Sequence, residues 1–405
     1  MPEAVIVSAA RSPIGRAVKG SLKDVRPDDL AAAMVAAALA KVPELDIRDV
    51  DDLILGCGLP GGEQGFNMAR TVAVLLGHDG MPGTTVTRYC ASSLQSTRMA
   101  LHAIRAGEGH AFVAAGVECV SRVSRGSSDS PDNRNPVFMS AADRSRETMA
   151  TNASTWHDPR DRGLMPDVYI AMGQTAENVA RLRGITRRMQ DEFAVRSQNL
   201  AEKAAANGFW QREITPVTLP DGTVISADDG PRQGVTLAAV EALSPVFRPD
   251  GTVTAGNCCP LNDGAAALVV MSDTKAAALD IEPLARIVST GVSALSPEIM
   301  GLGPVEASRR ALAHARMSTA DVDLVEINEA FAAQVIPTYT ELGVDLAKVN
   351  VNGGAIAVGH PYGMSGARLI TTAINSLQYH DEHLALVTMC VGGGQGMAMI
   401  LERLA

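Results

Sequence analysis

Apolar and polar positions along the chain follow the period of helices and the period of strands in turn. The run EAVIVSAA near the start is typical of a strand, and residues 27–58 (PDDLAAAMVAAALAKVPELDIRDVDDLILGCG) follow the pattern of a helix, a connector and a strand. The same order returns in residues 304–331 (PVEASRRALAHARMSTADVDLVEINEAF), where an amphipathic helix precedes a short polar link and a β-rich run. Helices and strands in alternation predict an α/β fold.

The chain also contains a repeat of longer segments. Residues 84–118 have the pattern of a strand, a tight turn, a helix and a second strand, and the stretch that begins NVNGGAIAVGHPYG at Asn350 follows the same plan. Three pairs of landmark residues are separated by nearly the same interval of about 270 residues. The pairs are Asp52 with Asp323, Cys90 with His360, and Gly116 with Cys390.

This repeat predicts three domains. Residues 1–118 and 251–405 are expected to form two similar α/β halves, and residues 119–250 an inserted segment that is rich in arginine and in loops. If a pseudo-twofold axis relates the halves, equivalent points come together at their interface. We therefore expect the thiol of Cys90 to lie near the imidazole of His360, each just before the helix of its own half.

Cys90 and His360 have the chemistry of an activated nucleophile and its base. A cysteine between a strand and a helix lies where unpaired N–H groups and the helix dipole favour the thiolate, and a nearby histidine can accept the proton. Pro361 and the glycines around His360 are typical of a tight, fixed turn. The alternative for Cys90 is simple burial as a small apolar side chain.

Cys390 and Asn328 are two further candidates. Cys390 precedes VGGGQG, whose glycines can expose backbone N–H groups to a developing oxyanion, and a second thiol there can shuttle a proton. A dinucleotide-binding loop is disfavoured, because too few residues follow for a βαβ unit. Asn328 ends a strand, where an amide can hold a water or a carbonyl oxygen; the simpler alternative is a helix N-cap.

Composition limits the classes of partner. Of the 405 residues, 46% are hydrophobic and only 3% aromatic, which suits an α/β enzyme packed with small side chains. The net charge of −10 argues against nucleic acid as a partner. The arginines of the insert indicate either a mixed-charge surface or a site for a small phosphorylated ligand, because arginine offers paired donors to phosphate.

Cysteine usage and the N-terminal sequence bear on the compartment. The six cysteines form no CxxC pairs and have no metal-ligand spacing, so we expect reduced thiols and no metal site. No apolar run approaches the length of a membrane span, and the first residues lack the pattern of a signal peptide. These features predict a cytoplasmic protein.

Seven motifs, in order along nearly the whole chain, resemble those of the thiolases. They are TRYCASS around Cys90, MGQTAENVA (172–180), GTVTAGN (251–257), NDGAA (262–266), NEAF (328–331), GGAIAVGHPYGMSGAR (353–368) and CVGGGQG (390–396). The resemblance implies a five-layered α-β-α-β-α core of two pseudo-twofold-related halves with an inserted loop domain. It also implies ping-pong cleavage of a 3-ketoacyl-CoA to acetyl-CoA and a shortened acyl-CoA, with coenzyme A (CoA) as a substrate and no tightly bound cofactor.

The resemblance further assigns roles by position. Cys90 would attack the 3-keto carbon, His360 would take the thiol proton, and Cys390 would protonate the enolate of acetyl-CoA. Asn328, through a water, and His360 would stabilise the enolate oxygen. The backbone N–H groups of Cys90 and Gly392 would stabilise the tetrahedral intermediate and the acyl-enzyme. The positions implied to contact CoA are Arg232, Met172, Ala255, Cys259, Ala330 and Phe331.

Two features favour a degradative enzyme that accepts more than acetoacetyl-CoA. Ala171 stands where short-chain biosynthetic thiolases have histidine, and the loop from Ser121 to Pro166 is long and polar. A biosynthetic, acetoacetyl-CoA-forming thiolase is the alternative, and an inactive acyl-CoA-binding relative is a remote one. The resemblance also implies a homodimer or homotetramer and allows a hydratase–dehydrogenase partner in β-oxidation.

Overall fold

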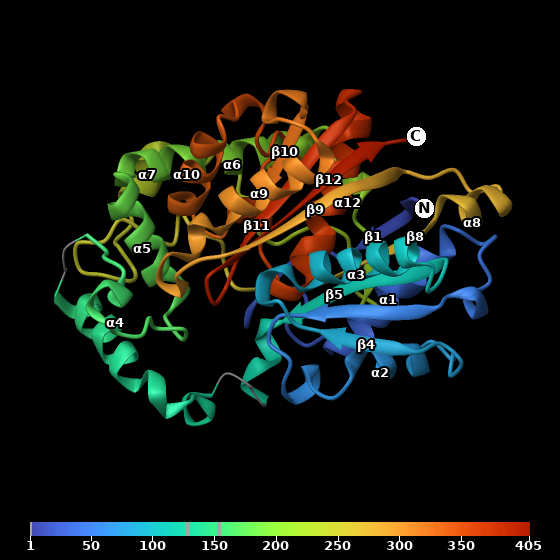
Figure 1. The fold of residues 1–405 in the computed structure, drawn as a ribbon, viewed down its shortest axis with the longest axis horizontal. Helices are drawn as coiled ribbons and strands as arrows, with labels where there is room; N and C mark the ends of the chain where they lie inside the picture. The colour runs from blue at the N-terminus through green and yellow to red at the C-terminus, as the bar shows by residue number, and fades with distance from the viewer. Residues whose placement is uncertain (1, 126–129, 152–154) are drawn as a thin grey trace.

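The computed structural model describes residues 2–125, 130–151 and 155–405, and its centre is a ten-stranded mixed sheet made of two halves. The strand order is β10-β11-β12-β9-β1-β8-β5-β3-β4, with the short β2 (Gly15–Arg16) beside β8. A separate two-stranded sheet pairs β6 (Val217–Thr218) with β7 (Val224–Ile225). Figure 1 shows the C-terminal half above the N-terminal half, with α4 (Met139–Thr151) and α5 (Met172–Arg183) of the insert at one side.

Four strands of each half have the same order and directions, and the N-terminal half adds β4 beyond β3. In the N-terminal half, β5 runs parallel to β3 and antiparallel to β8, which is antiparallel to β1. In the C-terminal half, β11 runs parallel to β10 and antiparallel to β12, which is antiparallel to β9. The strands are β1 (Ala4–Arg11), β3 (Asp52–Cys57), β4 (Gly83–Val86), β5 (Ala111–Cys119), β8 (Asn262–Ser272), β9 (Ala285–Ala294), β10 (Leu324–Ile327), β11 (Leu384–Val391) and β12 (Gln395–Arg403).

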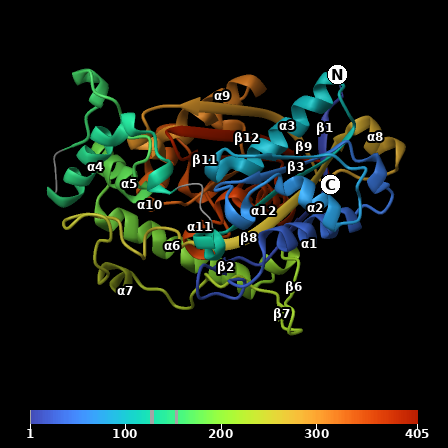
Figure 2. The same ribbon diagram turned by 90° about the horizontal axis from the view of Figure 1, so that it is seen from below.

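Helices cover both outer faces and fill the space between the halves. The helices α3 (Ser92–Ala106) and α12 (Ser365–His380) contact each other in the middle layer. On the outside, α1 (Pro27–Ala40) and α2 (Met68–Leu75) pack on the N-terminal half, and α9 (Gly303–Ala315) and α10 (Ala332–Leu342) on the other half. Figures 1 and 2 show this helix–sheet–helix–sheet–helix arrangement, which confirms the predicted five-layered fold. The remaining helices are α6 (Arg187–Ala206), α7 (Leu237–Glu241), α8 (Asp273–Ala278) and α11 (Ala355–Val358).

Alternation along the strands explains the layers. Apolar side chains at alternate strand positions, such as Ile6, Leu268 and Val387, pack against α3 and α12 in one central core. The side chains between them along the strands, such as Val5 and Val113, face the outer helices. Both faces of each half-sheet are therefore buried, which is why the strands are apolar nearly throughout.

Hydrogen bonds confirm the internal repeat but shift one of its landmarks by one residue. Oδ2 of Asp51 accepts from the N–H groups of His110 and Ala111 (2.6 and 2.9 Å), which lead into β5. Oδ2 of Asp323 accepts in the same way from the two N–H groups that lead into β11 (3.1 and 2.8 Å). Asp323 is therefore the counterpart of Asp51, and the match to Asp52 was wrong because the sequence DVDD offers neighbouring aspartates.

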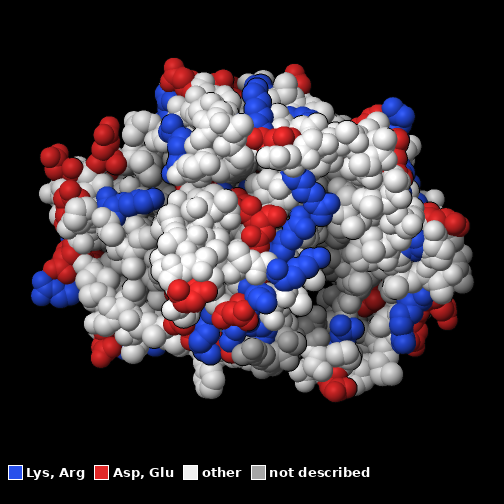
Figure 3. All heavy atoms as spheres, turned by 180° about the vertical axis from the view of Figure 1, so that it is seen from behind, with Lys and Arg blue, Asp and Glu red and all other residues white. Residues whose placement is uncertain are grey.

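The division at residues 118 and 250 stays a prediction, and strand pairing adds one detail to it. β8 follows residue 251 but pairs with β1 and β5 of the first segment. The half-sheets themselves meet where β1 pairs with β9, at Val5 with Arg286 and Ile6 with Ala285. Within the described residues, no helix is long and apolar enough to cross a bilayer. Figure 3 shows acidic and basic side chains intermixed on one face, with Lys and Arg gathered near its centre.

Candidate active site

Cys90 lies in a short turn that connects β4 to the middle-layer helix α3. The turn Tyr89–Ala91 begins with Tyr89 at φ 44°, a left-handed conformation that is costly for a bulky side chain. The hydroxyl of Ser92 accepts from the N–H of Arg88 (2.9 Å) and donates to the carbonyl of Tyr89 (2.6 Å), which fixes this conformation. The turn thus holds Cys90, which is buried, at the start of α3.

Burial and one backbone donor set the protonation state of Cys90. Burial raises the pKa of the Cys90 thiol to about 12, the backbone N–H of Gly392 pulls it downward, and the charge of Glu118 raises it. The thiol is therefore protonated at neutral pH in the resting protein. A thiolate forms here only when another group accepts the proton or when the sulfur bonds to a substrate.

His360 lies in the equivalent turn before α12. Gly359 precedes it at φ +115°, and a Cβ there would meet Ile14 at 2.6 Å, so only glycine fits. The N–H of His360 donates to Oδ1 of Asn262 (2.9 Å), and Nδ1 lies 2.6 Å from Oγ of Ser365. Ser365 in turn donates to the carbonyl of Pro361 (3.0 Å). This chain of hydrogen bonds places the proton on Nδ1 and leaves Nε2 as the acceptor.

Asn328 completes the surroundings of the imidazole. Its Nδ2 donates to Nε2 of His360 (3.2 Å), and its buried Oδ1 has no hydrogen-bond partner in the part of the chain that the structure describes. Burial, together with the charge of Arg368, lowers the pKa of His360 to about 3, so the ring is neutral at physiological pH. A neutral imidazole whose Nε2 carries a lone pair can act as a base, and the unpartnered Oδ1 can hold a water.

Cys390 lies near the end of β11, two residues before Gly392. Burial raises the pKa of its thiol well above the ordinary value, and the nearby charge of Cys90 raises it further. Cys259 also lies within electrostatic range of Cys90 and Cys390. The structure therefore brings three thiols and the backbone N–H of Gly392 together.

The turns of the two halves pack against each other at this point. The turn Tyr89–Ala91 contacts β11 and the turn Tyr362–Met364, which closely follows His360. The ring of Tyr362 lies edge-on to the His360 ring at 5.3 Å, and burial, then the charges of Cys259 and Cys90, raise the pKa of its hydroxyl. The residues from the two halves thus lie in one region, as their repeat positions suggest; their catalytic roles stay predictions.

A cavity of about 890 Å³ opens beside Cys90. Its floor includes Cys90, Gly392 and Tyr362, and its walls come mainly from the insert, including Phe138, Met139 and Tyr169. Of the positions implied to contact CoA, Met172 lines this cavity. The described walls are mostly apolar with a few polar groups, which is the usual composition of a small-molecule site.

The other implied CoA contacts lie in two places. The N–H of Cys259 donates to the carbonyl of Ala330 (3.1 Å), and the backbone of Cys258 pairs with that of Phe331 in an isolated β-bridge. These contacts bring the segments around Cys259 and Phe331 together near the thiols. Ala255 is exposed close by. Arg232 is exposed on a separate loop, where its N–H donates to Gln198 (3.0 Å). Their contacts with CoA stay predictions.

Several supporting residues were missed by sequence reasoning. Glu118 is fully buried and accepts from the N–H groups of Gly58, Leu59 and Gly363 and from the side chain of Gln64. It joins the turn after His360 to the first half. The signal was present, since Glu118 is an acid at the end of the apolar strand AAGVE, where an unpaired charge would be costly. Asn262 and Ser365 lie inside motifs, but nothing in their spacing indicated that both would hold His360.

A cysteine at a helix start that faces a backbone N–H, in the same region as a neutral, oriented imidazole, is typical of an enzyme that forms acyl-cysteine intermediates. The sequence identifies the family of this acyltransferase. Residues 4–274 match the model for the thiolase N-terminal domain, and residues 281–403 match the model for the thiolase C-terminal domain. The chain belongs to the thiolase family, and the predicted family is confirmed. Thiolases use CoA as a substrate and need no tightly bound cofactor.

Individual relatives are similar over their full length. The chain is 42% identical to the 3-ketoacyl-CoA thiolase of Bacillus subtilis (strain 168), covering 99% of this chain and 100% of the relative. It is 43% identical to the 3-oxoadipyl-CoA/3-oxo-5,6-dehydrosuberyl-CoA thiolase of Escherichia coli (strain K12), covering 100% of both. The crystal structure of the Bacillus anthracis acetyl-CoA acetyltransferase superimposes with a TM-score of 0.86 at 38% identity, covering 100% of this chain and 99% of that one.

Proposed function

We propose that this thiolase works in the degradative direction on 3-ketoacyl-CoA thioesters longer than acetoacetyl-CoA. The observation that carries the proposal is the cavity of about 890 Å³ beside Cys90, because its apolar wall from the insert, which includes Phe138 and Met139, offers packing to an acyl chain longer than acetyl. Ala171, which stands where the short-chain enzymes have histidine, lines this cavity, and the insert supplies most of its wall. A small residue and a large apolar space favour a longer acyl chain.

The geometry supports a definite role for each group in the first half-reaction. The sulfur of Cys90 attacks the 3-keto carbon while its proton passes to Nε2 of His360. The bond between C2 and C3 then breaks, and its electron pair forms the enolate of acetyl-CoA. Cys390 gives a proton to C2, which yields acetyl-CoA and leaves the shortened acyl group on Cys90. Burial of Cys390 as a neutral thiol suits it to donate this proton.

Two sets of donors stabilise the anionic oxygens of the proposed reaction. The N–H groups of Cys90 and Gly392 serve the tetrahedral intermediates at the acyl carbon, and Gly392 already faces the thiol in the resting site. A water on the unpartnered Oδ1 of Asn328, with His360, serves the enolate oxygen. Loss of one such donor typically costs about 3 kcal/mol of barrier. In the second half-reaction CoA attacks the acyl-cysteine and leaves as the shortened acyl-CoA.

CoA binding is proposed at the positions that the family resemblance implies. Ala255, Cys259, Ala330 and Phe331 lie close together next to the thiols, where the pantetheine arm must end. Arg232 is exposed on the insert and is available to the nucleotide. Guanidinium groups suit both phosphate and the face of an adenine ring.

A trapping experiment tests the mechanism and a substrate panel tests the direction. Wild-type protein mixed with a 3-ketoacyl-CoA in the absence of CoA should gain the mass of an acyl group, and Cys90→Ser should not. An inactive acyl-CoA-binding relative would bind the thioester but never acquire this mass.

The kcat/KM for thiolysis should be at least about tenfold higher for C6–C10 chains than for acetoacetyl-CoA, as expected for burial of several methylene groups. Turnover limited to acetoacetyl-CoA would refute the degradative proposal.

The second candidate is a biosynthetic, acetoacetyl-CoA-forming thiolase. The structural similarity to the Bacillus anthracis acetyl-CoA acetyltransferase favours it. The same panel separates the two, because a biosynthetic enzyme should condense acetyl-CoA efficiently and discriminate against long chains.

Cellular context completes the proposal. We place the enzyme in the cytoplasm, as a homodimer or homotetramer that takes part in β-oxidation and can work with a hydratase–dehydrogenase partner. The reduced state of the six cysteines supports a reducing compartment. Light scattering of the purified protein would give its mass in solution and so test the oligomeric state.

A further inference from the structure

A second, smaller cavity lies next to the substrate cavity and is lined by several cationic side chains. It has a volume of about 200 Å³ and is bounded by residues of the insert, among them Arg248, and by Glu298. Ser145, Ile170 and Gln174 line both cavities, so the two cavities adjoin at these residues. None of the residues to which the mechanism assigns a catalytic role lines the smaller cavity.

Arg248 is a buried cation whose hydrogen bonds go only to neutral groups. It is 4% exposed, and its Nε donates to Oε1 of Gln174 (2.7 Å), whereas Nη2 donates to Oδ1 of Asn178 (2.6 Å) and to the carbonyl of Gln174 (3.3 Å). Its Nη1 is buried and has no partner among the described residues. Among the residues that the structure describes, no carboxylate lies within ion-pair distance of Arg248. Such a donor is costly to bury unless a further acceptor reaches it.

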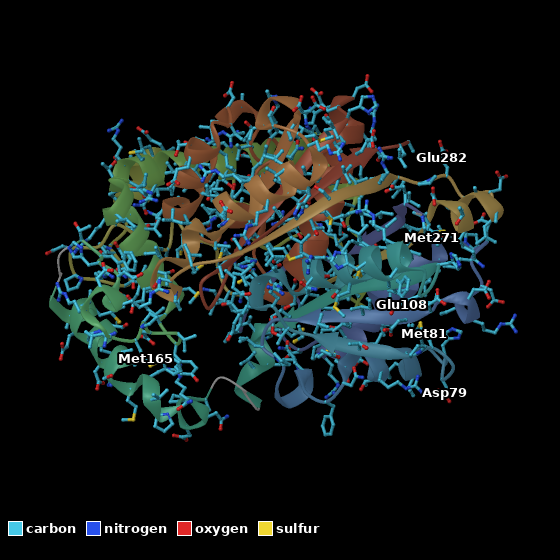
Figure 4. The ribbon with its side chains drawn as sticks, in the orientation of Figure 1. Asp79, Met81, Glu108, Met165, Met271 and Glu282 are labelled. Carbon is cyan, nitrogen blue, oxygen red and sulfur yellow. The ribbon has the colours of Figure 1, made fainter. Side chains whose placement is uncertain are left out.

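The rest of the wall supports an anion rather than a neutral ligand. Arg144 comes from α4 and donates to the carbonyls of Ser140 and Met165, so neither of these bonds neutralises its charge. Figure 4 shows Met165 beside α4. Arg162 and His157 also line the cavity.

The carboxylates of Glu298 and Asp158, which also line the cavity, already have hydrogen-bond or ion-pair partners. Glu298 accepts from Nε1 of Trp156 (2.7 Å) and from the N–H of Asp167 (2.9 Å), and Asp158 forms an ion pair with Arg160 (2.6 Å). Within the described part of the chain, neither is within ion-pair distance of Arg248 or Arg144. The described cavity therefore has more cationic than anionic groups available to a ligand.

We propose that this cavity binds a small oxyanion, a phosphate or carboxylate group, held by Arg248, Arg144 and Arg162. The three arginines come from different segments, α4, the turn Pro159–Arg162 and the loop before β8. An oxyanion between them would fasten α4 and the turn Pro159–Arg162 to the loop that carries Arg248. Because α4 also lines the substrate cavity, the bound anion would support the wall against which the acyl chain packs.

Thermal unfolding with inorganic phosphate tests this site without any need for catalysis. The melting temperature of wild-type protein should rise with phosphate and saturate, by about 1–2 °C at tenfold the dissociation constant, whereas sodium chloride at equal ionic strength should not reproduce the rise. Arg248→Met should abolish the saturable rise. The matched control is Arg188→Gln, an exposed arginine on α6 that pairs with Glu192, which should respond like wild type.

A second variant protects the test against misfolding. Arg144→Gln alters a residue whose described partners are carbonyls, so it should fold normally and weaken phosphate binding at least about fivefold, as expected for the loss of one charged donor. If phosphate stabilises both variants as strongly as wild type, or if the wild-type response never saturates, the proposal is wrong.

Competition identifies the source of the oxyanion. If a phosphate of CoA occupies the site, phosphate should compete with CoA, and the preference of wild type for CoA over dephospho-CoA should vanish in Arg144→Gln. If the site takes a terminal carboxylate of the acyl chain, phosphate should inhibit thiolysis of 3-oxoadipyl-CoA competitively and leave thiolysis of the uncharged analogue 3-oxohexanoyl-CoA unchanged. If the site takes a free anion, phosphate should compete neither with CoA nor with the acyl chain.

The two proposals can fail separately. Thiolase activity without any phosphate binding would overturn only the anion site, and phosphate binding without thiolase activity would overturn only the proposed function.

Discussion

Cys90 and His360 occupy surroundings that oppose charge on either side chain. Burial raises the pKa of the thiol to about 12 and lowers that of the imidazole to about 3. The resting pair is therefore neutral at physiological pH, unlike a preformed thiolate–imidazolium pair. In the proposed reaction, proton transfer becomes favourable only as the sulfur bonds to a carbonyl carbon and the new negative charge moves to a hydrogen-bonded oxygen. In that mechanism the reactive thiolate forms only when substrate is present.

Glu326 should give the folded protein a distinct pH dependence. Its carboxyl group lies on the inner face of β10, where burial raises its pKa to about 8. The charges around it are Arg368 and Arg196, which lower this pKa, and Glu329 and Glu213, which raise it. Between pH 4.5 and 8 the folded protein keeps a proton that the unfolded chain has released, so the free energy of unfolding contributed by this group falls as pH rises.

Glu326→Gln removes this titration and is therefore the test. Its free energy of unfolding relative to wild type should increase between pH 5 and pH 8, by up to about 4 kcal/mol, because one pKa unit corresponds to about 1.4 kcal/mol. Urea denaturation of both proteins at the two pH values measures the difference. Parallel pH profiles would show that Glu326 titrates normally.

At the scale of elements, each half uses one aspartate to hold the start of a strand. Asp51 and Asp323 each accept two backbone N–H groups, at the entrances of β5 and β11. Asp323→Ala and Asp51→Ala should each lower the free energy of unfolding by about 1–2 kcal/mol, because two charge-assisted bonds are lost at a partly exposed site. Chemical denaturation measures both, and the double variant should be additive since the sites lie in separate half-sheets.

The matched control for these variants is Asp24→Ala. Asp24 is exposed and its ion pair with Lys23 spans 3.9 Å, so the loss of its carboxylate should change stability by less than about 0.5 kcal/mol. Equal effects at all three aspartates would contradict the capping role of Asp51 and Asp323.

The helices, the strands and the internal repeat could be predicted because they depend on the local pattern of apolar and polar residues. The helix before Asp52 and the helix after His360 have the apolar spacing that burial on one face demands, and the structure places both as helices. The partners of β8 could not be predicted, since an apolar strand fits either half-sheet and the choice is made by long-range pairing. For the same reason no pattern revealed that Asn262, on β8, would hold the N–H of His360.

At the scale of the whole molecule, the site depends on how the two halves are joined. Glu118 is a direct link, because Oε2 accepts both from Gly58 of the first half (2.8 Å) and from Gly363 of the second (2.9 Å). Glu118→Ala would leave its buried N–H donors without an acceptor. It should lower the free energy of unfolding by at least about 3 kcal/mol and reduce kcat at least about tenfold, because the turn after His360 loses its anchor.

Denaturant unfolding and the steady-state rate of thiolysis measure these two effects. Glu108→Ala is a suitable control, since Glu108 lies in the same half on the exposed end of the loop before β5 (Figure 4) and has no role in the site. A Glu118→Ala enzyme with unchanged kcat would mean that the His360 turn holds its position without this link.

The place of β8 has a consequence for how the protein is made. β8 fills the slot between β1 and β5, although it comes after both of them in the chain and the insert separates it from β5. While the polypeptide is still emerging from the ribosome, those two strands must wait with open edges on either side of a gap. The N-terminal half is therefore the part of the nascent chain most exposed to mispairing, and the strand that carries Asn262 is the one that closes the gap.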